Sequence, residues 1–152
     1  MILKAESGDL EQILELQYLA YQSEAALLND YSIPPLKQTM EEVKQEYSHS
    51  IFLKAADEKG NIIGSVRACI DNSTAYIGKL IVLPERQGQG IGTELLHAIE
   101  RQCAVARYEL YTSNKSIRNI QLYERLGYVR FREQNHANGL TLVYMEKYSA
   151  EK

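Results

Sequence analysis

Apolar residues recur along this chain with two different spacings. Leu10, Ile13, Leu14 and Tyr18 fall three or four positions apart, which is the spacing of a buried helical face. Elsewhere short apolar runs lie between turn residues, as in β-strands. The pattern predicts strands at 1–5, 51–56, 62–70, 75–83, 108–112, 128–134 and 140–147, and helices at 10–21, 39–47, 91–103 and 116–126.

Polar residues, prolines and glycines set the expected ends of these elements. Asp9 and Ser116 stand where helix N-caps belong, and Thr39–Glu42 resembles a capping box. Gly127 occupies the position after a helix that glycine favours. The pair Pro34–Pro35 is expected to stop any helix there and to form a stiff connection. The sequence therefore predicts an α/β (α+β) fold, with a single mixed, mostly antiparallel sheet and helices on both faces.

Composition narrows the class of protein. A length of 152 residues suits one domain spanning 1–152. The net charge of −3 lacks the basic surface expected of a nucleic-acid partner, and it slightly favours a cationic ligand. No apolar run reaches the roughly 18 residues of a membrane span, and no signal peptide is expected. The two cysteines and three histidines lack metal-ligand spacing, so we expect no metal and a cytoplasmic location.

The stretch from Leu80 to Thr93 runs from an apolar strand through a glycine-rich turn into a helix. Glycines on alternate positions let the backbone approach a ligand closely, and the free N–H groups of the helix attract phosphate. A P-loop requires a lysine that the turn lacks. The dinucleotide motif Gly-x-Gly-x-x-Gly also fails, because its last position is Thr93 when counted from Gly88.

The spacing that fits is Gln/Arg-x-x-Gly-x-Gly/Ala, which Gln87–Gly92 matches directly after a strand ending in Leu-x-Val-x-Pro. Here the sequence resembles the GCN5-related N-acetyltransferase (GNAT) family. A second family segment, a helix carrying Leu-Tyr-Glu and ending at Gly-Tyr, resembles Asn119–Tyr128. The order of predicted elements also agrees, so the resemblance covers nearly the whole chain.

The resemblance implies where acetyl-coenzyme A binds as a cosubstrate. The loop amides would hold its pyrophosphate, and the expected contacts are Gln87, Gly88, Gln89, Gly90, Ile91, Gly92 and Thr93. The backbone of Leu80, Ile81 and Val82 would pair with the pantetheine arm, and an amide there would stabilise the oxyanion. Many members carry an asparagine seven residues before the family tyrosine. That position is Ser116 here, so we assign a coenzyme contact to Asn119, with Asn114 as the other candidate.

Tyr123 matches the family tyrosine that protonates the departing thiolate. A phenol with a pKa of about 10 is protonated at neutral pH, and an alkyl thiol resembles cysteine, with a pKa of about 8.5. The alternative is that Tyr123 is only a packed aromatic residue of its helix. The glutamate that many members carry before the loop is missing. The candidates for the general base are Glu109, Glu24, Glu46 and His136.

Taken together, the sequence predicts a single-domain N-acetyltransferase. It would move acetyl from acetyl-coenzyme A to a primary amine of a small molecule or a protein, by direct attack in a ternary complex. The alternative is a non-catalytic acyl-coenzyme A sensor of the same fold. Neither a nucleic-acid nor a membrane partner is expected, and the resemblance leaves a homodimer open because dimers are common in the family.

Overall fold

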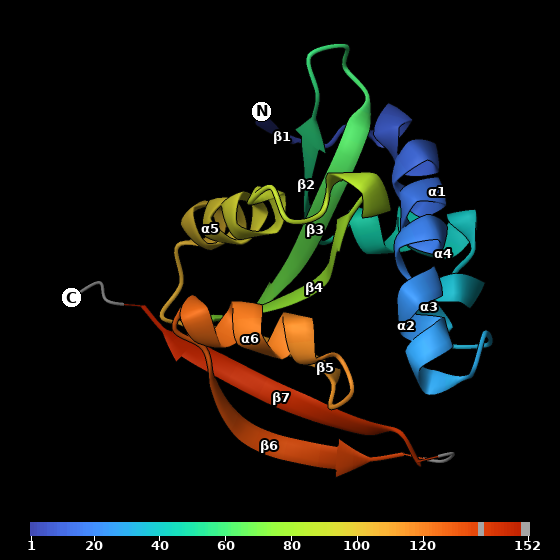
Figure 1. The fold of residues 1–152 in the computed structure, drawn as a ribbon. Helices are drawn as coiled ribbons and strands as arrows, with labels where there is room; N and C mark the ends of the chain where they lie inside the picture. Colours follow the sequence, from blue (N-terminus) through green and yellow to red (C-terminus); the bar gives the residue numbers. More distant parts are fainter. Residues whose placement is uncertain (137–138, 150–152) are drawn as a thin grey trace.

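The computed structural model describes residues 1–136 and 139–149, and its strands form one seven-stranded sheet (Figure 1). The sheet has the order β1-β2-β3-β4-β5-β7-β6, and only β4 and β5 run parallel. The strands are β1 (Ile2–Lys4), β2 (Ile51–Ala56), β3 (Ile62–Asp71), β4 (Thr74–Val82), β5 (Arg107–Ser113), β6 (Val129–Asn135) and β7 (Thr141–Tyr148). The predicted mixed, mostly antiparallel sheet is confirmed. The predicted loop before β7 falls partly on residues 137 and 138, which lie outside the described residues, as do 150–152.

The described part of the chain contains six α-helices around the sheet, two more than the sequence pattern predicted. They are α1 (Leu10–Ala20), α2 (Gln22–Leu28), α3 (Pro34–Lys37), α4 (Met40–Tyr47), α5 (Ile91–Cys103) and α6 (Ile117–Arg125), with short 3₁₀ helices at Ser7–Asp9 and Pro84–Arg86. The expectation that Pro34–Pro35 only interrupts helices was wrong, because the two prolines form the first turn of α3. Proline fits there because a helix leaves its first N–H groups unbonded anyway.

The predicted N-caps had different outcomes. Thr39 forms the expected capping box with Glu42, with hydrogen bonds of 3.2 and 2.9 Å. Asp9 does not cap α1 with its side chain; its carboxylate accepts from the Glu6 amide at 2.8 Å instead. The Ser116 hydroxyl likewise makes no cap and donates to a different helix. A short polar side chain can satisfy either its own helix or a distant partner, and here tertiary packing supplied the partner.

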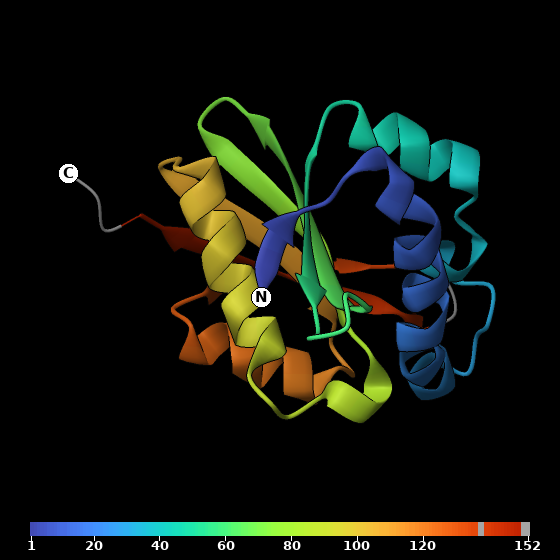
Figure 2. The same ribbon diagram turned by 90° about the horizontal axis from the view of Figure 1, so that it is seen from above.

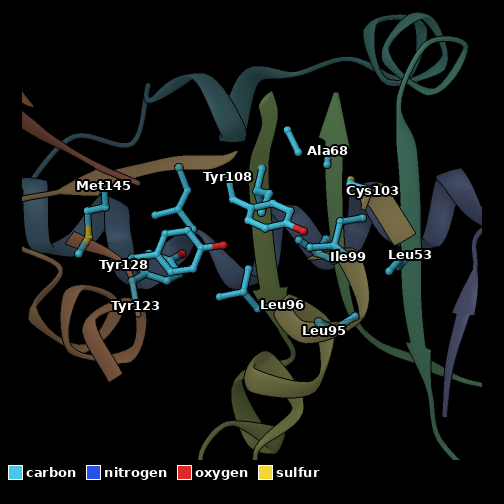
Figure 3. Close-up of a cluster of buried hydrophobic side chains, with 14 of the residues drawn as sticks. Leu53, Ala68, Leu95, Leu96, Ile99, Cys103, Tyr108, Tyr123, Tyr128 and Met145 are labelled. Atoms are coloured by element: carbon cyan, nitrogen blue, oxygen red, sulfur yellow. The ribbon is translucent and has the colours of Figure 1, made fainter. Parts of the chain in front are cut away.

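Helices cover both faces of the sheet, as predicted (Figure 2). One face is covered by α5 and α6, whose apolar side chains form the larger core with those of β2 to β5 and β7 (Figure 3). The other face carries α1 and α4, which pack around Phe52 in a smaller core. The strand β3 lies between the two cores, so Val66 and Arg67, on opposite faces, are both buried.

The two parallel strands separate toward their C-terminal ends. Pairing between them covers only Thr74–Tyr76 of β4 and Arg107–Glu109 of β5. Beyond these residues the β5-β7-β6 part of the sheet turns away from the β1-to-β4 part (Figure 1). A bulge in β4 adds to the change of direction, with Lys79 in the left-handed conformation at φ 50°. The opening between the strand ends therefore exposes two backbone edges.

Among the described residues, no helix is long and apolar enough to cross a membrane.

Candidate active site

A cavity of about 530 Å³ occupies the opening between β4 and β5. Consecutive residues of both strands line it, namely Ile77–Val82 and Leu110–Ser113. Successive side chains of a strand point to opposite faces, so a consecutive run means that the strand edge itself borders the cavity. The cavity thus reaches both faces of the sheet, and its volume lies in the range of about 300 to 1,000 Å³ that is usual for ligand sites.

The glycine-rich turn lies beside this opening and is held in a conformation that requires glycine. Gly88 and Gly90 have φ values of 80° and 85°, and a side chain at either position would meet open space. The requirement is therefore the left-handed backbone, which other residues reach only at a cost. Gly90 is the N-cap of α5, so the free N–H groups at the start of α5 point toward the turn.

Gly92 and Gly64 contribute differently from these two glycines. Gly92 has an ordinary backbone, and a Cβ there would make only van der Waals contacts at 3.8 and 3.9 Å. At Gly64 a Cβ would lie 2.9 Å from the Leu95 side chain and 3.2 Å from the Ile81 carbonyl oxygen. Glycine in β3 therefore lets α5 pack closely on the sheet, and that packing fixes where the glycine turn lies.

Two side chains from α6 lie near the glycine-rich turn and the cavity. Asn119 lines the cavity, and its amide donates to the Thr112 hydroxyl at 3.4 Å. Arg118 donates to the Gln87 side chain at 3.3 Å, which brings a cation next to the glycine turn. Arg118 was not predicted, because nothing in the sequence distinguishes it from other exposed arginines of an amphipathic helix. A helix N-terminus and an arginine side by side favour a phosphate ligand.

Tyr123 lies where α6 meets the cavity, and only 6% of it is exposed. Its ring packs 6.1 Å from that of Tyr128 (Figure 3). Burial, and then the negative charge of Glu24, raise the pKa of the Tyr123 phenol above its ordinary value. The phenol is therefore protonated at neutral pH, and it is also a weaker acid toward a thiolate than an exposed tyrosine. Tyr123 both packs in the core and borders the cavity.

The four candidate bases differ in whether they line the cavity. Glu109 lies 2.9 Å from Arg107, and Glu46 lies 2.8 Å from Arg67; neither carboxylate lines the cavity. Glu24 and His136 do line it. The candidates brought to the cavity are thus one carboxylate from α2, a helix that the sequence did not predict, and one imidazole next to β6.

A hydrogen bond between α2 and α6 holds Glu24 in place. The Ser116 hydroxyl, only 5% exposed, donates to the Glu24 carboxylate at 2.6 Å across 92 positions of sequence. Ser116 is the position where the family resemblance expected an asparagine. Asn114, the other asparagine considered, is exposed and does not line the cavity.

The side of the cavity facing α2 and α3 is rich in aromatic and apolar side chains. Burial, and then the charges of Tyr123 and Glu24, raise the pKa of Tyr21, so this phenol lies among those two groups. Opposite α2, the rings of Tyr111 and Tyr144 lie 5.2 Å apart and both line the cavity. We name this part the acceptor half; its apolar members are Leu28, Ile33, Pro34, Pro35, Leu140 and Leu142.

A buried arginine joins the elements around the acceptor half through hydrogen bonds. Arg67 is 2% exposed, and its guanidinium donates to Glu46 at 2.8 Å and to Gln17 at 2.9 Å. It also lies 4.4 Å above the centre of the Phe52 ring. Gln17 in turn donates to the Pro35 carbonyl oxygen at 2.8 Å. This network links β3, α1, α3 and α4, and Arg67 is close enough to Lys79 to affect its pKa.

Among residues 1–136 and 139–149, no three His, Cys, Asp or Glu side chains are grouped so that they could hold a metal ion. The positions assigned to the coenzyme and its thioester come together at one opening: Leu80, Ile81, Val82, Gln87, Asn119 and Tyr123 all line the cavity. The rest of the glycine turn lies next to it through Gln87. The sequence did not single out Arg118, Lys79 or the buried state of Arg67, which only the folded chain places here.

Known proteins resemble this chain along nearly its whole length. It is 28% identical over 157 residues to the S-(2-succino)cysteine N-acetyltransferase of Bacillus subtilis (strain 168). The aligned region covers 94% of this chain and 92% of the relative. PaiA N-acetyltransferase from Thermoplasma acidophilum, solved in complex with coenzyme A, superposes with a TM-score of 0.79 at 21% identity over 98% of both chains. The ribosomal-protein-S18-alanine N-acetyltransferase of Escherichia coli superposes with a TM-score of 0.77 at 18% identity, over 97% of this chain and 92% of that one.

These two solved structures confirm the predicted fold. The family model of the acetyltransferase (GNAT) domain matches residues 19–149, which include both motifs and all the residues that line the cavity. The chain therefore belongs to the GNAT family of N-acetyltransferases.

Proposed function

We propose that this protein transfers the acetyl group of acetyl-coenzyme A directly to the primary amine of an acceptor, in a ternary complex. The observation that carries the proposal is the single cavity that passes between β4 and β5. The glycine turn borders it on one side, and a carboxylate and aromatic side chains border it on the other. Two substrates entering from opposite faces would meet at Tyr123 and the edge of β4.

The donor fits the first side of the opening through main-chain groups. The turn from Gln87 to Thr93 offers N–H groups to a pyrophosphate, and Arg118 adds a positive charge. The free edge of β4 at Leu80–Val82 can pair with the amide-bearing pantetheine arm as an added strand. An N–H group of that edge, with that of Val82 the best placed by family resemblance, would polarise the thioester carbonyl. Asn119 extends this surface.

Glu24 and Tyr123 have the roles of base and acid. The ammonium of the acceptor gives a proton to the Glu24 carboxylate, and the neutral nitrogen attacks the thioester carbon. A C–N bond forms, the C–S bond breaks, and the leaving thiolate takes a proton from the Tyr123 phenol. The attacking nitrogen then loses its second proton to the Tyr123 phenolate, which restores the phenol, and Glu24 releases the first proton to solvent. The Ser116 hydrogen bond keeps the Glu24 carboxylate oriented. Burial, and then the charge of Glu24, raise the pKa of Tyr123, so the phenol holds its proton until the thiolate leaves.

Direct attack is favoured over an acyl-enzyme because neither cysteine is placed to act as a nucleophile. Cys69 is exposed on β3, and Cys103 is buried in α5; neither lines the cavity. Burial also raises the pKa of Cys103 to about 11, so the thiol that would need to ionise stays protonated. The acetyl group would therefore pass straight from sulfur to nitrogen.

The acceptor is proposed to be an amine, in line with the names of the relatives. These include an N-acetyltransferase for S-(2-succino)cysteine, one for the alanine of ribosomal protein S18 and one for spermidine. They share an amino group but differ widely in size and charge, so they do not select one acceptor for this chain.

The test is an assay of thiol release from acetyl-coenzyme A with a panel of small amines and N-terminal peptides. We expect release with at least one amine and a product that carries one acetyl group by mass spectrometry. Tight coenzyme binding without release from any amine would instead support the sensor alternative and contradict the proposal.

A matched pair of variants tests the base. Glu24→Gln keeps an acceptor for the Ser116 hydroxyl and removes the basic oxygen, so kcat at neutral pH should fall by roughly 10²- to 10⁴-fold. Glu109→Gln makes the same change in a carboxylate outside the cavity and should leave kcat within about twofold of the wild type. Equal effects of the two variants would remove Glu24 from the mechanism.

A further inference from the structure

Lys79 is the one positively charged side chain that lines the cavity without a partner among the described residues. It lies in the bulge of β4, half-buried, and it makes neither a hydrogen bond nor an ion pair with the rest of the described chain. Its left-handed backbone, at φ 50°, is uncommon for a lysine. A half-buried ammonium without a direct ion-pair partner is costly, so its position at the edge of a cavity calls for an explanation.

The other charges near Lys79 are already satisfied. Arg67 lies beneath it, and its charge is balanced by Glu46 at 2.8 Å. Glu24, on α2, accepts a hydrogen bond from Ser116 at 2.6 Å. Apart from His136, the charged side chains that line the cavity are therefore one unpaired cation on β4 and one carboxylate on α2. That pattern is complementary to a ligand that carries both an ammonium and a carboxylate.

We propose that the acceptor is a small amine bearing a carboxylate, such as an α-amino acid or its conjugate with an apolar side chain, whose carboxylate binds Lys79 while its amine faces Glu24. The inference rests on the proposed acetyl transfer and specifies its acceptor. It differs from what the net charge of the whole chain suggested, because the charges at the cavity act at short range.

The walls of the acceptor half agree with an apolar body between the two charged ends. Leu28, Ile33 and Pro34 line one side, and Tyr111 and Leu142 line the other. Such walls bury a hydrocarbon or aromatic side chain but give no hydrogen bonds to a sugar. The fold thus offers three contacts in one place: a cation, a carboxylate and an apolar surface.

Electrostatics at Lys79 point the same way. Burial, and then the charge of Arg67, lower its pKa below the ordinary value, while Glu46 opposes this effect. A bound carboxylate would remove much of this cost, because an opposite charge within a few ångström favours the charged form. A polyamine would place a second cation against the same side chain and would raise the cost instead.

The experiment compares three acceptors that share a phenyl ring and an amine but differ at the carboxylate, with a polyamine as a fourth. Thiol release is measured for L-phenylalanine, L-phenylalaninamide and phenethylamine, and for spermidine, each at several concentrations with saturating acetyl-coenzyme A. We expect kcat/KM for phenylalanine to exceed that for either analogue without a carboxylate by at least about tenfold, which corresponds to roughly one good charge-assisted contact. Spermidine should rank last.

Three variants locate the effect at Lys79. Lys79→Met removes the charge at similar length and should bring the phenylalanine-to-phenylalaninamide ratio of kcat/KM close to one, chiefly through the KM of phenylalanine. Lys79→Arg restores a positive charge and should recover much of the preference. Lys37→Met changes an exposed lysine of α3 that does not line the cavity, and it should leave the ratio unchanged.

The outcomes separate this inference from the proposed function. Release with spermidine or phenethylamine that equals or exceeds release with phenylalanine would overturn the carboxylate acceptor and leave the acetyltransferase standing. A preference for phenylalanine that survives Lys79→Met would overturn the role of Lys79. No release with any amine would contradict the proposed function itself. Coenzyme binding by each variant, followed by its thermal shift, shows that the variant is folded.

Discussion

The two halves of the cavity are built from different chemical groups. On the donor side, the groups available for contacts are main-chain N–H groups of the turn and the edge of β4. Gly88 and Gly90 give the turn its left-handed backbone conformation. On the acceptor side they are side chains from α2, β4 and β5, among them Glu24, Lys79 and Tyr111. Main-chain contacts tolerate changes of side chain, whereas side-chain contacts change with every substitution.

This difference suggests a reason why proteins of one fold could bind the same acetyl donor and yet act on different amine acceptors. A backbone binding surface needs only the right φ values and a free helix start, and those are local properties. A side-chain surface depends on which helix packs against the opening, and here that helix is α2. The relatives named for quite different amines are consistent with this division. Four predictions test it, in order of decreasing effect.

The largest effect is expected at the point where the two halves meet. Tyr123→Phe removes the phenol proton and should lower kcat by roughly 10²- to 10⁴-fold, while coenzyme affinity stays close to that of the wild type. Steady-state thiol release and calorimetric coenzyme titration measure the two quantities. Tyr128→Phe is the matched control, because it changes a neighbouring buried ring that does not line the cavity. An unchanged kcat in Tyr123→Phe would make that residue a packing residue only.

The next largest effect is expected for the buried hydrogen-bond network of Arg67, which joins the elements around the acceptor half. Arg67→Met leaves Glu46, Gln17 and Gln38 without their shared donor, and the free energy of unfolding should fall by about 2 to 4 kcal/mol. Urea denaturation measures it. The acceptor KM should rise while coenzyme affinity in the folded variant is retained.

The control for Arg67 is an exposed ion pair. Arg130 contacts Glu124 at 3.3 Å with about half of each side chain exposed, so Arg130→Met should cost less than about 1 kcal/mol. Equal costs for the two variants would show that the buried network does not hold the acceptor half together.

The donor half should respond to a change of backbone conformation. Gly90→Ala forces a side chain into the left-handed region at φ 85°, at a cost of about 1 to 2 kcal/mol. Coenzyme Kd should rise by roughly 5- to 30-fold as the turn relaxes away from its binding conformation. Gly60→Ala has the same φ in a turn outside the cavity and should lose stability without losing coenzyme affinity. Comparing the two variants separates the cost of backbone strain to stability from its effect on coenzyme affinity.

The smallest effect is a dependence of stability on pH. Burial alone would raise the pKa of Glu46, but the charge of Arg67 and the hydrogen bond from Gln38 hold it below its ordinary value. The unfolded chain therefore binds this proton first, so the contribution of Glu46 to stability is present above about pH 4.3 and is lost as the pH falls through the folded value.

Unfolding free energies measured from pH 7 down to pH 3 check this sign. Glu46→Gln should be less stable than the wild type at pH 7, and the difference should shrink on acidification. Glu41→Gln changes an exposed carboxylate on the same helix α4 and should keep the pH dependence of the wild type. A wild-type profile that does not differ from that of Glu46→Gln would remove the ion pair from the stability of the acceptor half.

Sequence patterns predicted local structure well and helix caps unevenly. Every strand and the four longest helices were predicted, because hydrophobic spacing reports directly on which residues face a core. Thr39 and Glu42 formed the expected capping box because both partners lie within four residues. Asp9 and Ser116 did not cap their helices, since each found a partner elsewhere; for Ser116 that partner is 92 positions away.

The elements that we propose to bind the donor could therefore be predicted from the sequence alone. They are a strand, a turn with glycines at positive φ and the start of a helix, and all of them are set by residues within fifteen positions of one another. The acceptor half was decided only by tertiary structure. Glu24, Lys79 and Arg67 come from distant parts of the chain, and each is ordinary in its local pattern. They form a site because β4 and β5 diverge and α2 packs over the opening, and no local periodicity records those long-range contacts.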